Sequence, residues 1–181
     1  WNASQSDEHA PAEPPVQVVE KAPDAKVVLV IGDFVGAGTA EGLNAVFASN
    51  PRVRSVDRSN GSSGVARPDY FDWTGSIAAM IETEKPSVVI FVVGANDRQQ
   101  MKVGTTREPV RSEAWTTEYT LRATSFAKAV AQTRVPLIWV GAPAFKPAKM
   151  NSDMLAFNEI YRGLVTEVKG EFVDVWDGFV D

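Results

Sequence analysis

Apolar residues fall along this chain in two patterns, short unbroken runs and longer stretches in which they recur every three or four positions. The run at 87–93 (SVVIFVV) is nearly continuous and rich in β-branched residues, and the run at 26–31 (KVVLVI) is of the same kind. Runs of this length and composition are typical of strands buried on both faces of a parallel sheet. They predict a central strand at 88–93 and a neighbouring strand at 26–31.

The rest of the pattern predicts the other elements. Three further strands are predicted at 52–58, 135–140 and 172–176. Helices are predicted where apolar residues recur at helical spacing, at 39–49, 70–84, 113–132 and 151–169. The glycine-rich stretch 32–38 is expected to be a turn, and the polar stretches 59–69 and 98–111 are expected to be irregular.

Predicted strands alternate with predicted helices from residue 26 onward. This order favours a doubly wound α/β fold, because crossovers between parallel strands are short and right-handed. We expect three layers around a five-stranded parallel sheet with the flavodoxin-like strand order 2-1-3-4-5. Residues 1–25 are rich in Pro, Ser, Glu, Asp and Ala, which predicts a flexible leader or linker before one domain at 26–181.

Composition narrows the functions that the chain can have. Its 181 residues carry a net charge of −5 and no basic stripe, which argues against nucleic-acid binding. No apolar run approaches the ~18 residues of a transmembrane helix. Cysteine is absent, which excludes disulfides and thiolate chemistry, and the one histidine, His9, lies in the predicted leader. The chain begins at Trp1 without Met, so we expect a processed product or an excised piece.

Glycine-containing loops follow the first four predicted strands, at 32–38, 59–64, 94–97 and 141–143. Because the carboxyl ends of parallel strands meet at one edge of a sheet, these loops are expected to lie together there. Two of them carry carboxylates, Asp33 and Asp97. Two interpretations stay open: Asp33 hydrogen-bonds to neighbouring loop amides, which we favour, or the two carboxylates jointly bind Mg²⁺ through oxygen ligands. No metal or cofactor is assigned.

The same loops resemble a known family. Gly32-Asp33-Phe34, then Gly64, then Gly94-Ala95-Asn96-Asp97 are similar to blocks one to three of the SGNH (GDSL) hydrolase superfamily. The flanking stretches resemble an uncharacterised bacterial subgroup associated with the cell envelope; they are 64–73, 96–99, 139–143 and 173–177. The resemblance covers 26–181 and implies the SGNH-hydrolase fold and an exported, periplasmic or envelope-associated protein.

The resemblance also implies acyl transfer. In the family a block-one serine attacks an ester carbonyl, and a histidine in an Asp-x-x-His block near the carboxyl end acts as base. Gly64 and Asn96 match the family's oxyanion donors. Phe34, however, stands at the position of the serine, and no Asp-x-x-His block occurs before the chain stops at Asp181. We therefore expect the C-terminal end of the domain to lie beyond this chain.

These departures predict a degenerate catalytic site, since loss of either residue of such a pair costs about 10⁶ in turnover. We expect a pseudoenzyme that binds a glycan or an envelope protein. The alternatives are a carbohydrate or acyl esterase whose missing residues lie outside this chain, and a carboxylate–metal enzyme. Residues expected to line the cleft are Asp33, Ser63, Arg67, Asp97, Arg98 and Gln99. Trp73 and Trp115 are candidates for stacking on a sugar, although core positions are favoured for them.

Overall fold

The computed structural model describes residues 17–180. The first sixteen residues of the predicted leader, with His9, and Asp181 lie outside the described residues. Residues 17–25 form no helix or strand, but Val19 N donates to Ala48 O at 3.0 Å and Lys21 Nζ donates to Asn50 O at 2.9 Å. This stretch therefore binds to the turn that follows the first helix, and the division into leader and domain stays a prediction.

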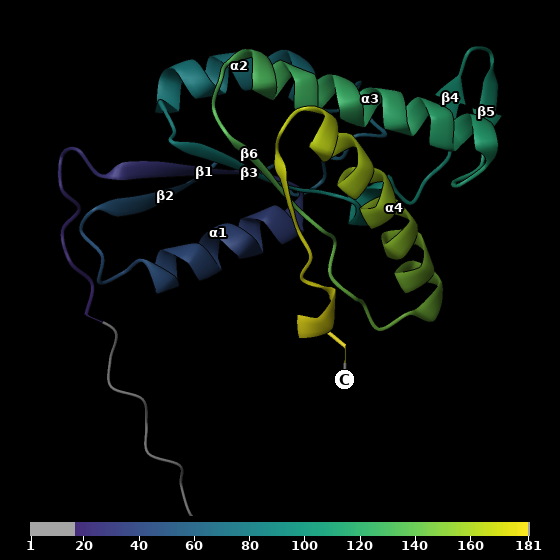
Figure 1. The fold of residues 1–181 in the computed structure, drawn as a ribbon. Coiled ribbons are helices and arrows are strands. Elements are labelled where there is room, and N and C mark those ends of the chain that lie inside the picture. The colour runs from purple at the N-terminus through teal and green to yellow at the C-terminus, as the bar shows by residue number, and fades with distance from the viewer. Residues whose placement is uncertain (1–16, 181) are drawn as a thin grey trace, which may run out of the picture.

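Five parallel strands form the central sheet (Figure 1). The strands are β1 (Lys26–Gly32), β2 (Val53–Asp57), β3 (Val88–Val92), β6 (Leu137–Val140) and β7 (Glu171–Val173). Their order is β2-β1-β3-β6-β7, which confirms the predicted order 2-1-3-4-5 and the central place of 88–93. The central strand pairs with β1 and β6 along its two edges, and its alternate side chains enter the two hydrophobic cores on the opposite faces of the sheet.

Helices cover both faces of the sheet and complete the three layers (Figure 1). They are α1 (Phe34–Val46), α2 (Trp73–Glu84), α3 (Glu113–Gln132) and α4 (Ala148–Glu167). The larger core lies between the sheet and α2, α3 and α4, where Phe91, Trp139 and Phe126 pack ring against ring. A smaller core lies under α1 and contains Val30 and Ala40. The predicted three-layer α/β fold is confirmed.

The first helix begins at Phe34, where a glycine-rich turn was predicted. Asp33 is its N-cap, because the carboxylate accepts a hydrogen bond from Val35 N at 2.8 Å. Gly36 has a packing role rather than a turn role, since a Cβ there would lie 3.1 Å from Ile31 O. The glycine allows α1 to start close against β1, which outweighs its low helix propensity.

The stretch 98–111, predicted to be irregular, contains a hairpin. Its strands β4 (Met101–Val103) and β5 (Thr106–Glu108) pair antiparallel around Gly104, whose φ is +60°. Strands of three residues are too short to produce a recognisable alternation of apolar and polar positions. The prediction of irregular structure is therefore wrong for this segment.

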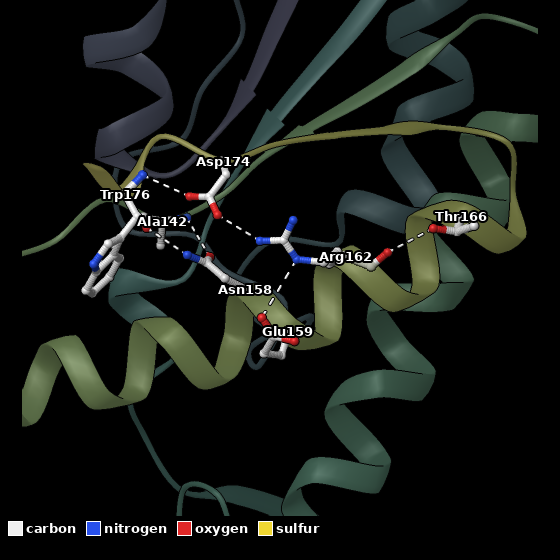
Figure 2. A network of polar contacts seen from close by, with 7 residues as sticks. All are labelled: Ala142, Asn158, Glu159, Arg162, Thr166, Asp174 and Trp176. Carbon is white, nitrogen blue, oxygen red and sulfur yellow. Dashed lines mark hydrogen bonds and ion pairs between the residues drawn. The ribbon is translucent and has the colours of Figure 1, made fainter. Parts of the chain in front are cut away.

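Polar contacts fix the segments that follow β6 and β7 (Figure 2). Asn158 of α4 donates to Ala142 O at 3.0 Å and accepts from Ala142 N at 2.8 Å. Arg162 donates to Asp174 Oδ2 at 2.7 Å, and Asp174 Oδ1 accepts from Trp176 N at 2.9 Å. These two hydrogen bonds, that of Trp176 first, lower the pKa of Asp174. The chain after β7 is thereby held against α4, and it continues through the short helix η2 (Trp176–Gly178).

None of the helices within residues 17–180 is both long enough and apolar enough to cross a membrane.

Candidate functional site

The loops after β1, β2 and β3 meet at the carboxyl edge of the sheet. Asn60 N donates to Gly32 O at 2.8 Å, which joins the second loop to the end of β1. Asn96, in the short helix η1 (Ala95–Asp97) after β3, reaches the same loop through Gly61 O and Ser63 O. The structure therefore brings together the three blocks that carry the resemblance.

Asp97 is a buried carboxylate that holds the second loop in place. Its two oxygens accept hydrogen bonds from Val65 N at 3.1 Å, Ala66 N at 2.8 Å and the Tyr119 hydroxyl at 2.6 Å. Burial is the largest influence on its pKa and raises it, while the Tyr119 hydrogen bond acts in the opposite direction. All of these partners are protein donors and the residue is buried, so Asp97 organises the loop in this structure, and its contact with a ligand stays a prediction.

Asp33 is also buried, and only one of its oxygens is engaged. Oδ1 accepts from Val35 N, whereas Oδ2 makes no hydrogen bond with any residue of 17–180. Burial, together with the negative charge of Asp97, raises the pKa of Asp33 to about 7. Near neutral pH this carboxyl group therefore exists in both the protonated and the ionised form.

The two carboxylates differ in how far their oxygens are already hydrogen-bonded within the protein. Both oxygens of Asp97 are occupied by N–H and O–H donors. Within residues 17–180, no three side chains of the His, Cys, Asp and Glu types are grouped closely enough to hold a metal ion. Asp33 Oδ1 accepts from Val35 N, which is the kind of contact that the favoured interpretation expects, and the choice between the two interpretations stays a prediction.

Phe34 is the first residue of α1, next to Asp33. It is 48% exposed and lies beside Gly61 of the second loop. A phenyl ring has neither a nucleophilic atom nor a proton to transfer. Ser63, the buried hydroxyl nearest in sequence to Gly64, donates to Asn60 O at 2.7 Å and accepts from Trp73 Nε1 at 3.1 Å. Ser63 is therefore buried and stabilises the loop through these hydrogen bonds, and its contact with a ligand stays a prediction.

The two expected oxyanion donors differ in availability. Asn96 Nδ2 donates to Gly61 O and to Ser63 O, each at 2.9 Å. A carboxamide has two N–H groups, and here both are used inside the protein. Gly64 N–H makes no hydrogen bond to another residue of the described chain. Of these two expected donors, only the backbone N–H of Gly64 has no partner within residues 17–180.

The remaining predicted residues surround the site. Arg98 donates to Asp153 of α4 at 2.8 Å, and Gln99 Nε2 donates to Asn96 O at 2.6 Å. Trp73 and Trp115 are 3% and 0% exposed, so both belong to the core and neither offers a face to a sugar. Arg98 and Gln99 thus chiefly stabilise the loop after β3 through these hydrogen bonds.

A pocket that the sequence did not predict opens next to these loops. It has a volume of about 680 Å³ and lies between the loop at 66–69, the segment 99–102, Arg107 and Arg122. One of its walls includes part of the β4–β5 hairpin, whose existence the sequence pattern did not indicate. The excess of Lys and Arg in that hairpin was the only available signal.

The chain matches one known protein family. A family model described as "Protein of unknown function (DUF459)" matches residues 27–181. A search of curated proteins gave no match.

Several solved structures share the fold. AlinE4, an SGNH-hydrolase family esterase, is 17% identical with a TM-score of 0.60, over 84% of this chain and 77% of that one. LAE5, an alpha/beta hydrolase enzyme from the metagenome of Lake Arreo, Spain, is 21% identical with a TM-score of 0.61, over 89% and 80%. A catalytic mutant of Axe2, an acetylxylan esterase from Geobacillus stearothermophilus, is 18% identical with a TM-score of 0.58, over 88% and 80%. At these identities the likeness shows the fold alone.

Proposed function

Because the chain belongs to the DUF459 family and has the fold of the SGNH hydrolases, we propose that it is a non-catalytic relative of those enzymes. In this proposal it keeps the cleft at the carboxyl edge of the sheet and uses it to bind a ligand. The proposed ligand is a glycan, and an envelope protein is the alternative. The acetylxylan esterase among the structures of the same fold supports a carbohydrate ligand.

The observation that carries the proposal is the place of Phe34. This residue follows Asp33 at the start of α1, where the family resemblance expects the serine that attacks the ester. Its exposed ring can contact a ligand but cannot form an acyl intermediate. Loss of the nucleophile from a serine–histidine pair removes about 10⁶ of the turnover.

Two further features agree with binding rather than turnover. The side-chain amide of Asn96 donates both of its N–H groups to the backbone carbonyls of Gly61 and Ser63, so it does not stabilise an oxyanion in this conformation. The only histidine of the sequence is His9, so no imidazole base occurs within residues 17–180. A carbonyl can still be polarised by Gly64 N–H, but polarisation without an attacking group leads to binding.

An esterase is the second candidate, favoured by the esterases of the same fold and by the unused Gly64 N–H. In this version the missing catalytic residues lie outside the chain. It requires a nucleophile other than residue 34 as well as a base.

The test combines hydrolysis and binding. The purified chain is assayed with p-nitrophenyl acetate and with acetylated xylo-oligosaccharides, and titrated with the same oligosaccharides by calorimetry. The expected result is no hydrolysis above buffer and oligosaccharide binding that weakens in a Phe34→Ala variant. Turnover that falls sharply in Asn96→Ala would favour the esterase. Failure to bind both these neutral oligosaccharides and acidic sugars would overturn the glycan assignment.

The proposed location is the periplasm or the cell envelope, as the resemblance implies. Fractionation of cells that express the natural protein, followed by immunoblotting, tests it. Recovery in the cytoplasmic fraction would contradict this location.

A further inference from the structure

The pocket of about 680 Å³ beside the candidate site has an unusual balance of charge. Four of its lining side chains are cationic: Arg67, Lys102, Arg107 and Arg122. Asp69 supplies the only carboxylate that lines it. This concentration of positive charge occurs in a chain whose net charge is −5, so it does not reflect overall composition.

Two of the four cations are neutralised within the protein. Arg67 donates to both oxygens of Asp69, at 2.8 and 2.7 Å. Arg122 donates to Glu118, one turn earlier on α3, at 2.7 Å. The other two cations form no ion pair with another residue of the described chain. The pocket therefore keeps a surplus of two positive charges.

The two unpaired cations, Lys102 and Arg107, lie directly opposite each other in the β4–β5 hairpin. Side chains of directly opposed residues project from the same face of an antiparallel pair. Like charges in such positions destabilise the pair. The other face of β4 supplies the core contact through Met101, which is 2% exposed, so packing does not explain why positions 102 and 107 are cationic.

We propose that Lys102 and Arg107 bind an anionic group of the ligand, a carboxylate or a phosphoryl group, in this pocket. Arginine offers a planar fork of N–H donors that matches both groups, and lysine adds a compact positive charge. An anion between the two side chains would replace their repulsion with attraction. The pocket adjoins the candidate site because its first wall, 66–69, begins just after Gly64. The inference rests on the proposed function, which identifies the ligand as a glycan. Together the two proposals give an acidic glycan as the ligand.

Calorimetric titration of the whole chain tests this inference. The probes are trigalacturonate, glucose 6-phosphate and the neutral trisaccharide maltotriose. The test variant is Lys102→Gln with Arg107→Gln. The matched control is Arg52→Gln with Lys128→Gln, which removes the same charge from exposed positions away from the pocket. Thermal unfolding of each variant checks that it is folded.

We expect at least one anionic probe to bind more tightly than maltotriose, and to bind more weakly as the salt concentration rises. The dissociation constant is expected to rise about tenfold or more in the test variant, because charge-assisted hydrogen bonds are lost. The control should change it less than about twofold, as expected of screened, distant charges. Tighter binding of trigalacturonate identifies a carboxylate, and tighter binding of glucose 6-phosphate identifies a phosphoryl group.

Three results would overturn the inference: no binding of either anion, equal binding of charged and neutral sugars, or equal losses in test and control variants. None of these depends on hydrolysis. Ester turnover would contradict the proposed non-catalytic function but would not bear on anion binding in the pocket. Wild-type affinity of the double variant for the anions would refute anion binding by Lys102 and Arg107 but would not bear on the non-catalytic function.

Discussion

Gly64 and Asp97 touch so closely that no side chain fits at residue 64, because a Cβ there would overlap the Asp97 carboxylate. The carboxylate comes this close in order to accept hydrogen bonds from Val65 N and Ala66 N, the two amides that follow the glycine. Gly64, which the family resemblance marks as an oxyanion donor, is therefore also required by the packing of the loop.

Substitution of Gly64→Ala is expected to destabilise the protein by about 1–3 kcal/mol, the usual cost of overpacking a buried site. The methyl group must displace Asp97 or the loop, and either movement breaks hydrogen bonds at both amides. Urea denaturation measures the loss. The matched control is Gly42→Ala, at an exposed helical position of α1 with no atom near the new methyl group. That control should stabilise the protein by about 0.5–1 kcal/mol. Equal effects of the two variants would refute the packing argument.

The raised pKa of Asp33 predicts a pH dependence of stability. The carboxyl group titrates near its ordinary value of 3.8 when unfolded and at about 7 when folded. Between these values the folded state binds the proton more tightly than the unfolded state. This group therefore stabilises the protein fully below about pH 4, and its contribution is lost as the pH rises toward about 7. The loss is at most about 1.4 kcal/mol for each pH unit in that window.

An Asp33→Asn variant isolates this effect. Asn keeps an oxygen to accept from Val35 N and is an equally good N-cap, but it does not titrate. As the pH rises from about 4.5 to about 7.5, the free energy of unfolding of the variant should increase relative to that of the wild type. Urea denaturation of both proteins at these two pH values gives the difference. A constant difference would show that Asp33 has an ordinary pKa.

The sequence predicted the sheet well, because long apolar runs and the rule of right-handed crossovers leave few strand orders open. It also placed α3 at 113–132, and the structure adds that Ser112 is the N-cap of this helix, whose hydroxyl accepts from Trp115 N at 3.3 Å. It misplaced the start of α1, since only the three-dimensional packing shows that Gly36 allows close approach to β1.

At the site, topology predicted that the loops meet but not which way their side chains point. Ser63 and Asn96 have the residue types of a catalytic cleft, yet both turn inward to hold loop carbonyls. That direction depends on backbone groups brought close by folding, which no local pattern reports. The cationic pocket was missed for a related reason, because it is defined by a hairpin too short to recognise.

The repulsion proposed between Lys102 and Arg107 predicts that Lys102→Glu stabilises the hairpin. The substitution turns a like-charged cross-strand pair into an oppositely charged one, which is worth about 0.2–1 kcal/mol. Thermal unfolding at low salt should show a small increase in Tm that shrinks at high salt. Lys128→Glu, at an exposed position of α3, serves as the control. The same Lys102→Glu variant should lose the binding of anionic sugars. A lower Tm would contradict the proposed repulsion.

Restoring a serine at position 34 is expected not to restore an esterase. Phe34→Ser supplies a hydroxyl at the start of α1, but no histidine within residues 17–180 can accept its proton. Asn96 also remains committed to Gly61 and Ser63. An oxyanion donor alone gives about 10³–10⁴ over water. Hydrolysis of p-nitrophenyl acetate by the variant should therefore stay at least about 10⁴-fold below that of an intact triad. Rates typical of esterases in this variant would show that a base is already in place, and that Phe34 alone accounts for the absence of ester hydrolysis in the wild type.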